Sequence, residues 1–291
     1  MGIVIGFIVL VLVLAAAALL RAAAFRPPKR QTHAEPVPEV NAQRAVAHLQ
    51  EMIRCRTISA PELRDEAEFE KFRSLLPEFY PLLWEKAQVE RVDTTGILIH
   101  VTGQVPGNSA VMLAHYDVVP AHADAWEKPP FAGVLEDGVL WGRGALDMKN
   151  QLCAMLEAAE TLLEQGFVPK HDIYFALSGE EEIMGASAKS IRDLFVERNI
   201  IPAFVLDEGG DIMDGFFPGT TVPCAMVGIG EKGAANLVFT AKSQGGHASV
   251  PNANNPLPRL CRAMERVRKH PFPIRTGPAL DALVDTMGRY C

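Results

Sequence analysis

The amino-terminal end of the chain is apolar without interruption, and charged positions begin only after it. No charged residue occurs from Gly2 to Leu20, and Arg21 carries the first charge. At about 1.5 Å per helical residue this stretch reaches roughly 28 Å, close to the thickness of a bilayer's hydrocarbon core. The pattern therefore predicts a transmembrane anchor over residues 1–21 of a single-pass membrane protein. A cleaved signal peptide, which would leave the remainder secreted, is the alternative.

Residues 22–39 break this pattern with prolines and polar side chains, and they predict an extended linker. Basic residues also follow the apolar segment directly, namely Arg21, Arg26, Lys29 and Arg30. By the positive-inside tendency these residues favour a cytoplasmic position for the rest of the chain.

From about residue 40 the chain alternates between helical and strand patterns. Apolar residues at helical spacing predict helices over residues 40–55, 66–76, 148–164 and 186–197. Short apolar runs bounded by turn residues predict strands over 96–101, 110–114, 172–177 and 203–206. Asp137-Gly138 between two apolar runs predicts a hairpin. The alternation predicts a layered α/β domain over residues 40–226 with a mostly parallel central sheet.

Charge and cysteine content narrow the function classes. The chain has 28 Lys+Arg against 35 Asp+Glu, for a net charge of −7, and no basic run, which argues against a nucleic-acid partner. The five cysteines are widely spaced and form no C-x-x-C pair, which excludes a disulfide-stapled miniprotein and a thiolate zinc knuckle.

Acidic or imidazole side chains follow four of the predicted strands. His115 and Asp117 follow the strand at 110–114, and Asp147 follows the hairpin. Glu180-Glu181-Glu182 and Asp207-Glu208 follow the next two strands. Any one of these taken alone fits a helix cap or a solvated turn. Because reactive groups gather at the carboxyl ends of parallel strands, we expect all four groups at one sheet edge.

Such a gathering of carboxylates predicts a metal centre. Carboxylates in one crevice repel one another unless cations neutralise them. Imidazole plus carboxylates, without thiolates, suits Zn²⁺, with Co²⁺ or Mn²⁺ as alternatives. One imidazole and several carboxylates are too many ligands for one tetrahedral ion, but they fit two ions about 3.5 Å apart that share a bridging carboxylate.

The segments around these strand ends also resemble a known family. Residues 113–120 and 140–149 resemble the first and second metal motifs of the carboxypeptidase S branch of the co-catalytic zinc peptidases. Residues 179–182 and 205–210 resemble the glutamate pair and the next ligand segment, in the family's order. The family also holds glutamate carboxypeptidase, aminoacylase, dipeptidases and succinyl-diaminopimelate desuccinylase.

The resemblance implies a phosphorylase/hydrolase-like catalytic domain with two Zn²⁺ ions. His115 and Asp207 would bind one ion, Asp147 would bridge both, and Glu182 would bind the second. Glu181 would be the general base that deprotonates the bridging water and returns the proton to the leaving amine. The resemblance also implies that Asp117 orients His115 through its second ring nitrogen, and that a cis peptide bond follows Asp147.

The pattern changes from about residue 227. A strand is predicted over 234–241, then Gly245-Gly246-His247, then a helix over 255–269. This order resembles the start of the family's α+β lid domain, which would make residues 227–291 the beginning of a dimerisation domain. The resemblance implies that His247 donates to the oxyanion, often across a homodimer. The alternative for His247 is a capping or turn histidine.

One family feature is missing. Family members carry a second metal-binding histidine near the end of a longer chain, whereas only His247 and His270 follow Asp207 here. We therefore expect this sequence to be an amino-terminal part of a longer protein, with the Glu182 side of the metal pair incomplete. In this form it is expected to be weakly active or inactive.

These observations together predict a metal-dependent hydrolase that cleaves amide bonds of small peptides or N-acyl amino acids, in the manner of a carboxypeptidase or aminoacylase. A dinuclear phosphoesterase is an alternative, although it would need more histidines and phosphate-facing cations. A membrane-tethered metal-binding module that has lost catalysis is another.

Overall fold

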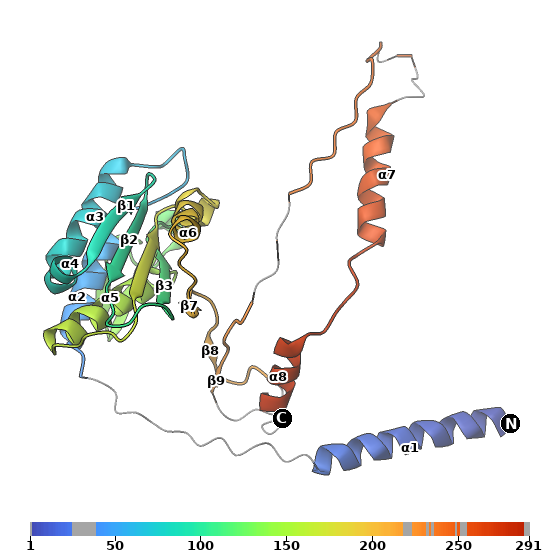
Figure 1. Ribbon diagram of the computed structural model, residues 1–291. Helices are drawn as coiled ribbons and strands as arrows, with labels where there is room; N and C mark the ends of the chain where they lie inside the picture. Colours follow the sequence, from blue (N-terminus) through green and yellow to red (C-terminus); the bar gives the residue numbers. More distant parts are fainter. Residues whose placement is uncertain are drawn as a thin grey trace. The chain divides into compact units, whose positions relative to one another are not determined.

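The structure of the chain is a computed structural model, and it describes residues 2–24, 39–217, 223–230, 233, 236–247, 249–250 and 255–287 (Figure 1). The chain divides into two units. One unit comprises Ala34–Glu208, and the other comprises Met1–His33 with Gly209–Cys291. Most of the predicted linker, residues 25–38, lies outside the described residues.

Helix α1 (Gly2–Ala24) forms where the apolar stretch predicts it. It has no buried residue, and its length and composition suffice to cross a membrane. A signal sequence near the amino terminus has the same properties, so both expectations for this segment stand.

The unit Ala34–Glu208 contains a five-stranded central sheet. Its strands are β1 (Gln88–Val92), β2 (Gly96–Val101), β6 (Ile173–Ser178), β3 (Ala110–His115) and β7 (Phe204–Leu206), in that spatial order. Strand β3 pairs in parallel with both β6 and β7. Strands β1, β2 and β6 pair antiparallel. The sheet is therefore mixed, and the prediction of a mostly parallel sheet is wrong.

The missed strand β1 is one reason for this difference. Gln88–Val92 alternates apolar and polar residues but holds only two valines, so it lacks the apolar run that marks the buried strands. A tight turn through Asp93, which has a left-handed φ of 55°, returns the chain as β2. A hairpin of this kind is antiparallel by necessity. Strand β2 then lies antiparallel to β6 as well.

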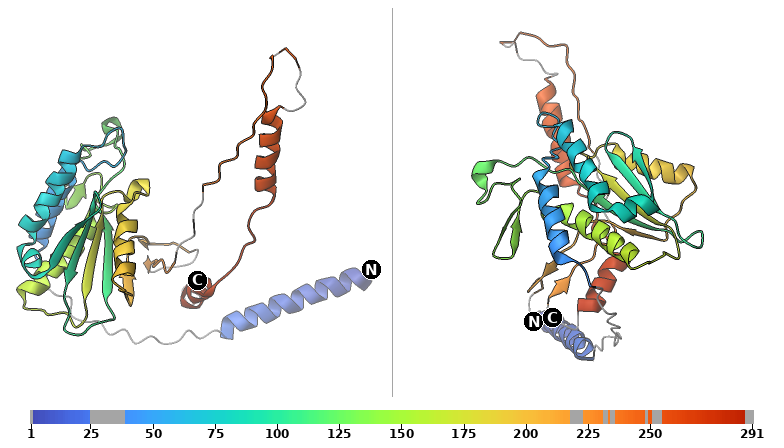
Figure 2. Two further views of the ribbon diagram at one scale, coloured as in Figure 1. Left: turned by 45° about the horizontal axis from the view of Figure 1, so that its top comes forward. Right: turned by 90° about the vertical axis from the view of Figure 1, so that its left-hand side faces the viewer.

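Helices cover both faces of the sheet (Figure 2). One face carries α2 (Ala42–Arg54), α3 (Glu66–Phe79), α4 (Pro81–Lys86) and α5 (Lys149–Glu164), and the other carries α6 (Ser187–Glu197). Alternate residues of β2 separate the two cores: Ile97 and Ile99 join the cluster with α2–α5, while Leu98 joins the cluster with α6. The four helices predicted in this unit are confirmed, and α4 is additional.

The predicted hairpin is confirmed, but it does not belong to the central sheet. Strands β4 (Val134–Glu136) and β5 (Val139–Trp141) form a separate two-stranded sheet. Asp137 and Gly138 both have positive φ angles, 51° and 79°, which matches the twist of a two-residue hairpin loop. The expectation that four strands of one sheet end together is therefore wrong for Asp147, which arrives on a loop between β5 and α5.

The other unit holds a short antiparallel pair, β8 (Ile212–Met213) with β9 (Cys224–Ala225), and helices α7 (Pro256–Lys269) and α8 (Pro278–Met287). Helix α7 confirms the helix predicted over 255–269. The predicted strand over 234–241 is wrong for residues 236–241, which form no strand. A strand exists only when a neighbour accepts and donates its backbone hydrogen bonds, and none pairs with this segment in the described part of the chain.

Candidate metal centre

His115 is the last residue of β3, and its side chain is 2% exposed. The ring nitrogen Nδ1 lies 3.0 Å from the backbone carbonyl oxygen of Asp117 and 3.4 Å from its carboxylate. In the tautomer of neutral His115 that carries its proton on Nδ1, the ring donates this proton to Asp117. The other nitrogen, Nε2, is then left with a lone pair that faces the acidic groups described below.

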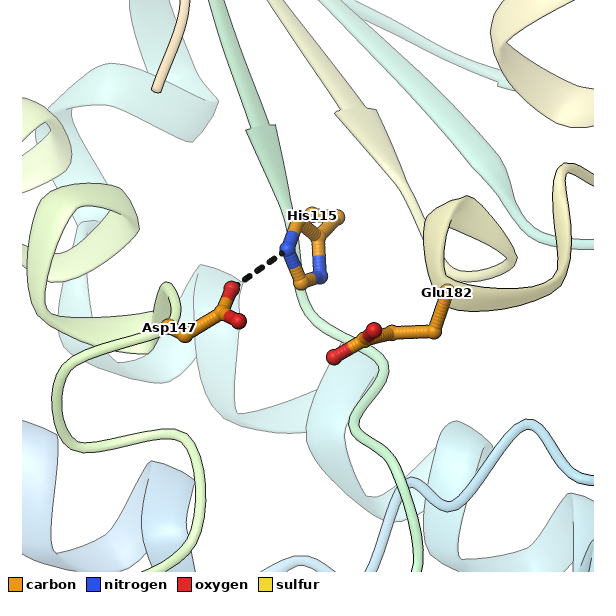
Figure 3. Close-up of side chains that lie close together, drawn as sticks. All are labelled: His115, Asp147 and Glu182. Carbon is orange, nitrogen blue, oxygen red and sulfur yellow. Dashed lines mark hydrogen bonds and ion pairs between the residues drawn. The ribbon is translucent and has the colours of Figure 1, made fainter. Parts of the chain in front are cut away.

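Asp147 reaches His115 from the loop that precedes α5. Its Oδ1 lies 3.0 Å from Nε2 of His115, and its side chain is largely exposed (Figure 3). The peptide bond between Asp147 and Met148 is cis, as the family resemblance implies.

Glu181 and Glu182 lie in the 3₁₀ turn Glu181–Ile183 directly after β6. Because β6 is parallel to β3, this turn emerges beside His115. The backbone N–H groups of Glu181 and Glu182 donate to the two carboxylate oxygens of Asp117 at 3.0 and 3.1 Å. Asp117 is fully buried. Its contacts join the predicted ligand His115 to the turn that carries the glutamates.

The structure brings three predicted ligands together. Donor atoms of His115, Asp147 and Glu182 all lie within 4.8 Å of one another, and Figure 3 shows the three side chains converging from β3, the α5 loop and the turn after β6. Donor atoms of His115, Glu181 and Glu208 form a second such group.

Glu208 is the acidic residue that sequence reasoning passed over. Its Oε1 lies 3.5 Å from Nε2 of His115, whereas the predicted ligand Asp207 belongs to neither group and lines an adjacent cavity. The signal was present in the sequence, because Asp207 and Glu208 are adjacent after β7 and either side chain could face the site.

Two carboxyl groups of the site have raised pKa values. Burial raises the pKa of Glu208 to about 7, and the charges of Asp147 and Glu181 add to this although His115 opposes it. Burial also raises the pKa of Glu182, with Asp147 adding to it. A cation bound at these carboxylates would favour their ionised forms.

His115 responds to the same surroundings. Burial lowers its pKa, but the contact with Asp117 and the charges of Asp117, Glu208 and Glu181 outweigh burial and raise the pKa to about 9. The imidazole thus takes up a proton where the cluster lacks a cation. One imidazole nitrogen and several carboxylate oxygens, without a thiolate, form a donor set that fits Zn²⁺, Co²⁺ or Mn²⁺.

A cavity of about 450 Å³ opens beside these groups. His115, Glu181 and Asp207 line one part of it. Apolar side chains from the sheet and from α6 line much of the rest, including Val111, Leu113, Ile191, Phe195 and Val205. The site therefore adjoins space that suits an apolar group of a ligand.

His247 belongs to the unit that contains Gly209–Cys291. Its Nδ1 lies 2.7 Å from Oγ of Ser249 and accepts from the backbone N–H of Ser249 at 3.3 Å. These are the contacts of a turn histidine, and its proposed part in the chemistry stays a prediction.

A family model described as peptidase family M20/M25/M40 matches residues 111–289, which is more than half of the chain. The chain belongs to this peptidase family. The match spans the segments that carry His115, Asp147 and the glutamate turn, and the resemblance drawn from the sequence is confirmed.

Individual family relatives cover the chain in part. The chain is 37% identical over 191 residues to human N-fatty-acyl-amino acid synthase/hydrolase PM20D1, which covers 65% of this chain and 38% of the relative. It is 36% identical over 231 residues to probable carboxypeptidase S-like 2 of Dictyostelium discoideum, which covers 78% of this chain and 44% of that protein. The chain thus spans less than half the length of these two relatives.

Among solved structures, an M20 family metallo-carboxypeptidase from Sulfolobus solfataricus aligns with a TM-score of 0.48 at 23% identity. The alignment covers 59% of this chain and 38% of that one.

Proposed function

We propose that this protein is a metal-dependent hydrolase that cleaves amide bonds in small peptides or N-acyl amino acids. The observation that carries the proposal is the convergence of His115, Asp147 and Glu182, with donor atoms within 4.8 Å, beside the carboxylate of Glu181. Family membership supports it, as does the activity in the name of the human relative, an N-fatty-acyl-amino acid synthase/hydrolase.

The metal would be held by His115, Asp147 and Glu182, with Asp147 as the bridge if two Zn²⁺ ions bind. His115 offers one free nitrogen and can serve only one ion. Asp207 and Glu208 are the two candidates for a further carboxylate on that ion, and the 3.5 Å approach to His115 favours Glu208. When bound, the metal would lower the pKa of a water molecule and polarise the scissile carbonyl.

Glu181 is the proposed general base. Its side chain is half exposed, and its Oε2 lies 3.8 Å from Nε2 of His115, within reach of a water bound at the cluster. Burial raises the pKa of Glu181, and the charges of Asp117, Asp147 and Asp207 add to this while His115 opposes it. A raised pKa suits a general base that works near neutral pH. It would accept the proton of the attacking water and deliver it to the departing amine.

Asp117 would position both the general base Glu181 and the metal ligand His115. One buried carboxylate accepts from the backbone of Glu181 and Glu182 and faces Nδ1 of His115, so it sets the distance between the base and the proposed metal ligand. The apolar cavity next to Glu181 suits the acyl or side-chain group of a substrate.

The organisation of the chain forms part of the proposal. Residues 40–226 would be the amino-terminal part of the catalytic domain, and residues 227–291 the beginning of a lid through which the protein dimerises. His247 would donate to the oxyanion from that lid. Helix α1 would anchor the protein in a membrane.

Hydrolysis assays on the purified full chain with added Zn²⁺ test the proposal. Because weak activity at most is expected of these 291 residues, we expect slow, zinc-dependent release of amino acid from N-acyl amino acids or dipeptides, and no release of phosphate from a phosphomonoester. Glu181→Gln should reduce turnover by about a hundredfold or more while zinc uptake stays unchanged. If a longer form that supplies the missing metal-binding histidine also takes up zinc but hydrolyses neither amide class, the metal-binding module is the better description.

A further inference from the structure

Lys149 is a fully buried lysine that the proposed chemistry does not use. It is the first residue of α5 and lies two positions after Asp147. Its ammonium Nζ donates to the backbone carbonyl oxygens of Met52 at 2.9 Å and Cys55 at 2.8 Å. It also lies 5.5 Å from the centre of the Phe72 ring. Burying an ammonium group is costly unless it is hydrogen-bonded, and here the two carbonyl oxygens supply those bonds.

The two carbonyl oxygens lie at the carboxyl end of α2. The last carbonyl groups of a helix have no partner within the helix, and the helix dipole makes this end negative. Cys55 is the residue that follows the last turn of α2. These two oxygens also accept from the backbone N–H groups of Cys55 and Thr57, so the ammonium of Lys149 adds a second donor to each and fixes the start of α5 against the end of α2.

The loop that presents Asp147 folds against the same side chain. The backbone N–H of Lys149 donates to the carbonyl oxygen of Gly144 at 3.0 Å. Gly144 has a φ of +84°, and a Cβ placed on it would lie 3.2 Å from Cδ of Lys149 and 2.9 Å from Cγ1 of Val118. Along the chain, Asp147 thus lies in a short segment whose two ends, Gly144 and Lys149, pack on each other.

We infer that Lys149 is a positioning residue for the metal centre: through its hold on the end of α2 and on Gly144, it fixes the carboxylate of Asp147 at His115. The inference rests on the proposed metal-binding function. It predicts that losing the ammonium displaces Asp147 and weakens metal binding, beyond any loss of stability in the core.

A matched control separates these two effects. Glu157 lies on the same helix, is buried, and accepts hydrogen bonds from Arg44 and His48 of α2. Glu157→Gln therefore weakens the same contact between α2 and α5 at a point remote from Asp147. Lys149→Met removes the ammonium but keeps the length of the stem.

The test uses the full chain and Co²⁺ alone as the probe, because its visible absorption reports the ligand geometry and its titration gives an affinity. Thermal unfolding of the metal-free proteins supplies the stability of each variant. We expect Lys149→Met to weaken Co²⁺ binding by about tenfold or more and to alter the absorption spectrum, as for loss of a group that orients a ligand. Glu157→Gln should lower the melting temperature with the spectrum and affinity unchanged.

Wild-type affinity and spectrum in a folded Lys149→Met protein would overturn the inference and leave the proposed function intact. Absence of Co²⁺ binding in the wild-type protein would instead overturn the proposed metal centre, and the inference with it. If Lys149→Met does not fold, Lys149→Gln, which keeps one hydrogen-bond donor for the two carbonyl oxygens, takes its place in the same titration. It should also weaken Co²⁺ binding and alter the spectrum, and an unchanged affinity would refute the positioning role.

Discussion

The backbone N–H of Glu181 donates a 3.0 Å hydrogen bond to the buried carboxylate of Asp117. This contact joins the end of β3 to the turn after β6, so the proposed base and the imidazole of His115 share one support. Because Asp117 also accepts from the backbone of Glu182, both glutamates depend on the same side chain. The distances within the site are therefore set by an acidic residue outside the proposed ligand set.

Replacing Asp117 with Asn tests this support. The amide nitrogen of Asn would face one of the two N–H donors that the carboxylate now accepts, and a buried donor would lose its partner. We expect a loss of about 1–3 kcal/mol in unfolding free energy, measured by urea denaturation. Metal affinity should fall about tenfold or more, measured by titration.

Asp172→Asn serves as the control for this substitution. Asp172 also accepts a hydrogen bond from a backbone N–H, that of Gly103 at 2.7 Å, but it lies at the opposite end of β6 from the glutamate turn. Its variant should lose stability and keep its metal affinity. Equal losses of metal affinity in both variants would show that Asp117 has no special part in the site.

Gly179 gives a test of the packing under the same turn. A Cβ added at this position would lie 2.6 Å from Cζ of Tyr116, which is fully buried, so a methyl group cannot be accommodated without movement. Gly179→Ala should destabilise the protein by about 1–3 kcal/mol in thermal or urea unfolding.

Gly277→Ala is the matched control for Gly179→Ala, because a Cβ there meets no atom within 4 Å. It should leave the unfolding free energy within about 0.5 kcal/mol of the wild-type value. Similar stabilities for the two variants would mean that the region around Tyr116 tolerates the added methyl group.

Metal affinity should rise with pH. The pKa of His115 in the metal-free protein is about 9, and that of Glu208 about 7. Below these values both groups hold protons that a metal ion must displace, so binding is weaker at low pH and strengthens as the protons leave. Between pH 6 and 8 we expect the apparent affinity for Co²⁺ to increase about tenfold per pH unit or more, since one proton or more is released.

Calorimetric titration in buffers of different ionisation enthalpy counts those protons directly. Release of at least one proton per bound ion at pH 7 agrees with His115 as a ligand. An affinity that does not change between pH 6 and 8 would speak against it.

The helices and the site were the most predictable parts of this chain. Long amphipathic patterns specify α2, α5 and α6, because one face of each must be buried whatever its partner. The closeness of His115, Asp147 and the glutamates was also predicted, because each follows a strand or hairpin at a point where the chain leaves the core.

The incorrect predictions share a cause, because each depends on contacts with residues that are distant along the chain. Strand direction depends on which neighbours pair. The hairpin of β1 with β2 was missed, and β2 lies antiparallel to β6 in a sheet that local patterns predicted to be mostly parallel. Residues 236–241 have a strand-like composition but no partner strand in the described part of the chain. The choice between Asp207 and Glu208 depends on where the backbone turns after Leu206, which adjacent acidic residues in a sequence do not reveal.

X-ray absorption spectroscopy at the zinc edge, on the full chain loaded with Zn²⁺ and then dialysed, tests the central claim most directly. We predict retained zinc with nitrogen and oxygen neighbours at about 2.0–2.2 Å and imidazole scattering that disappears in His115→Ala. Zinc lost on dialysis, a sulfur shell at about 2.3 Å, or a His115→Ala spectrum identical to the wild type would contradict the account.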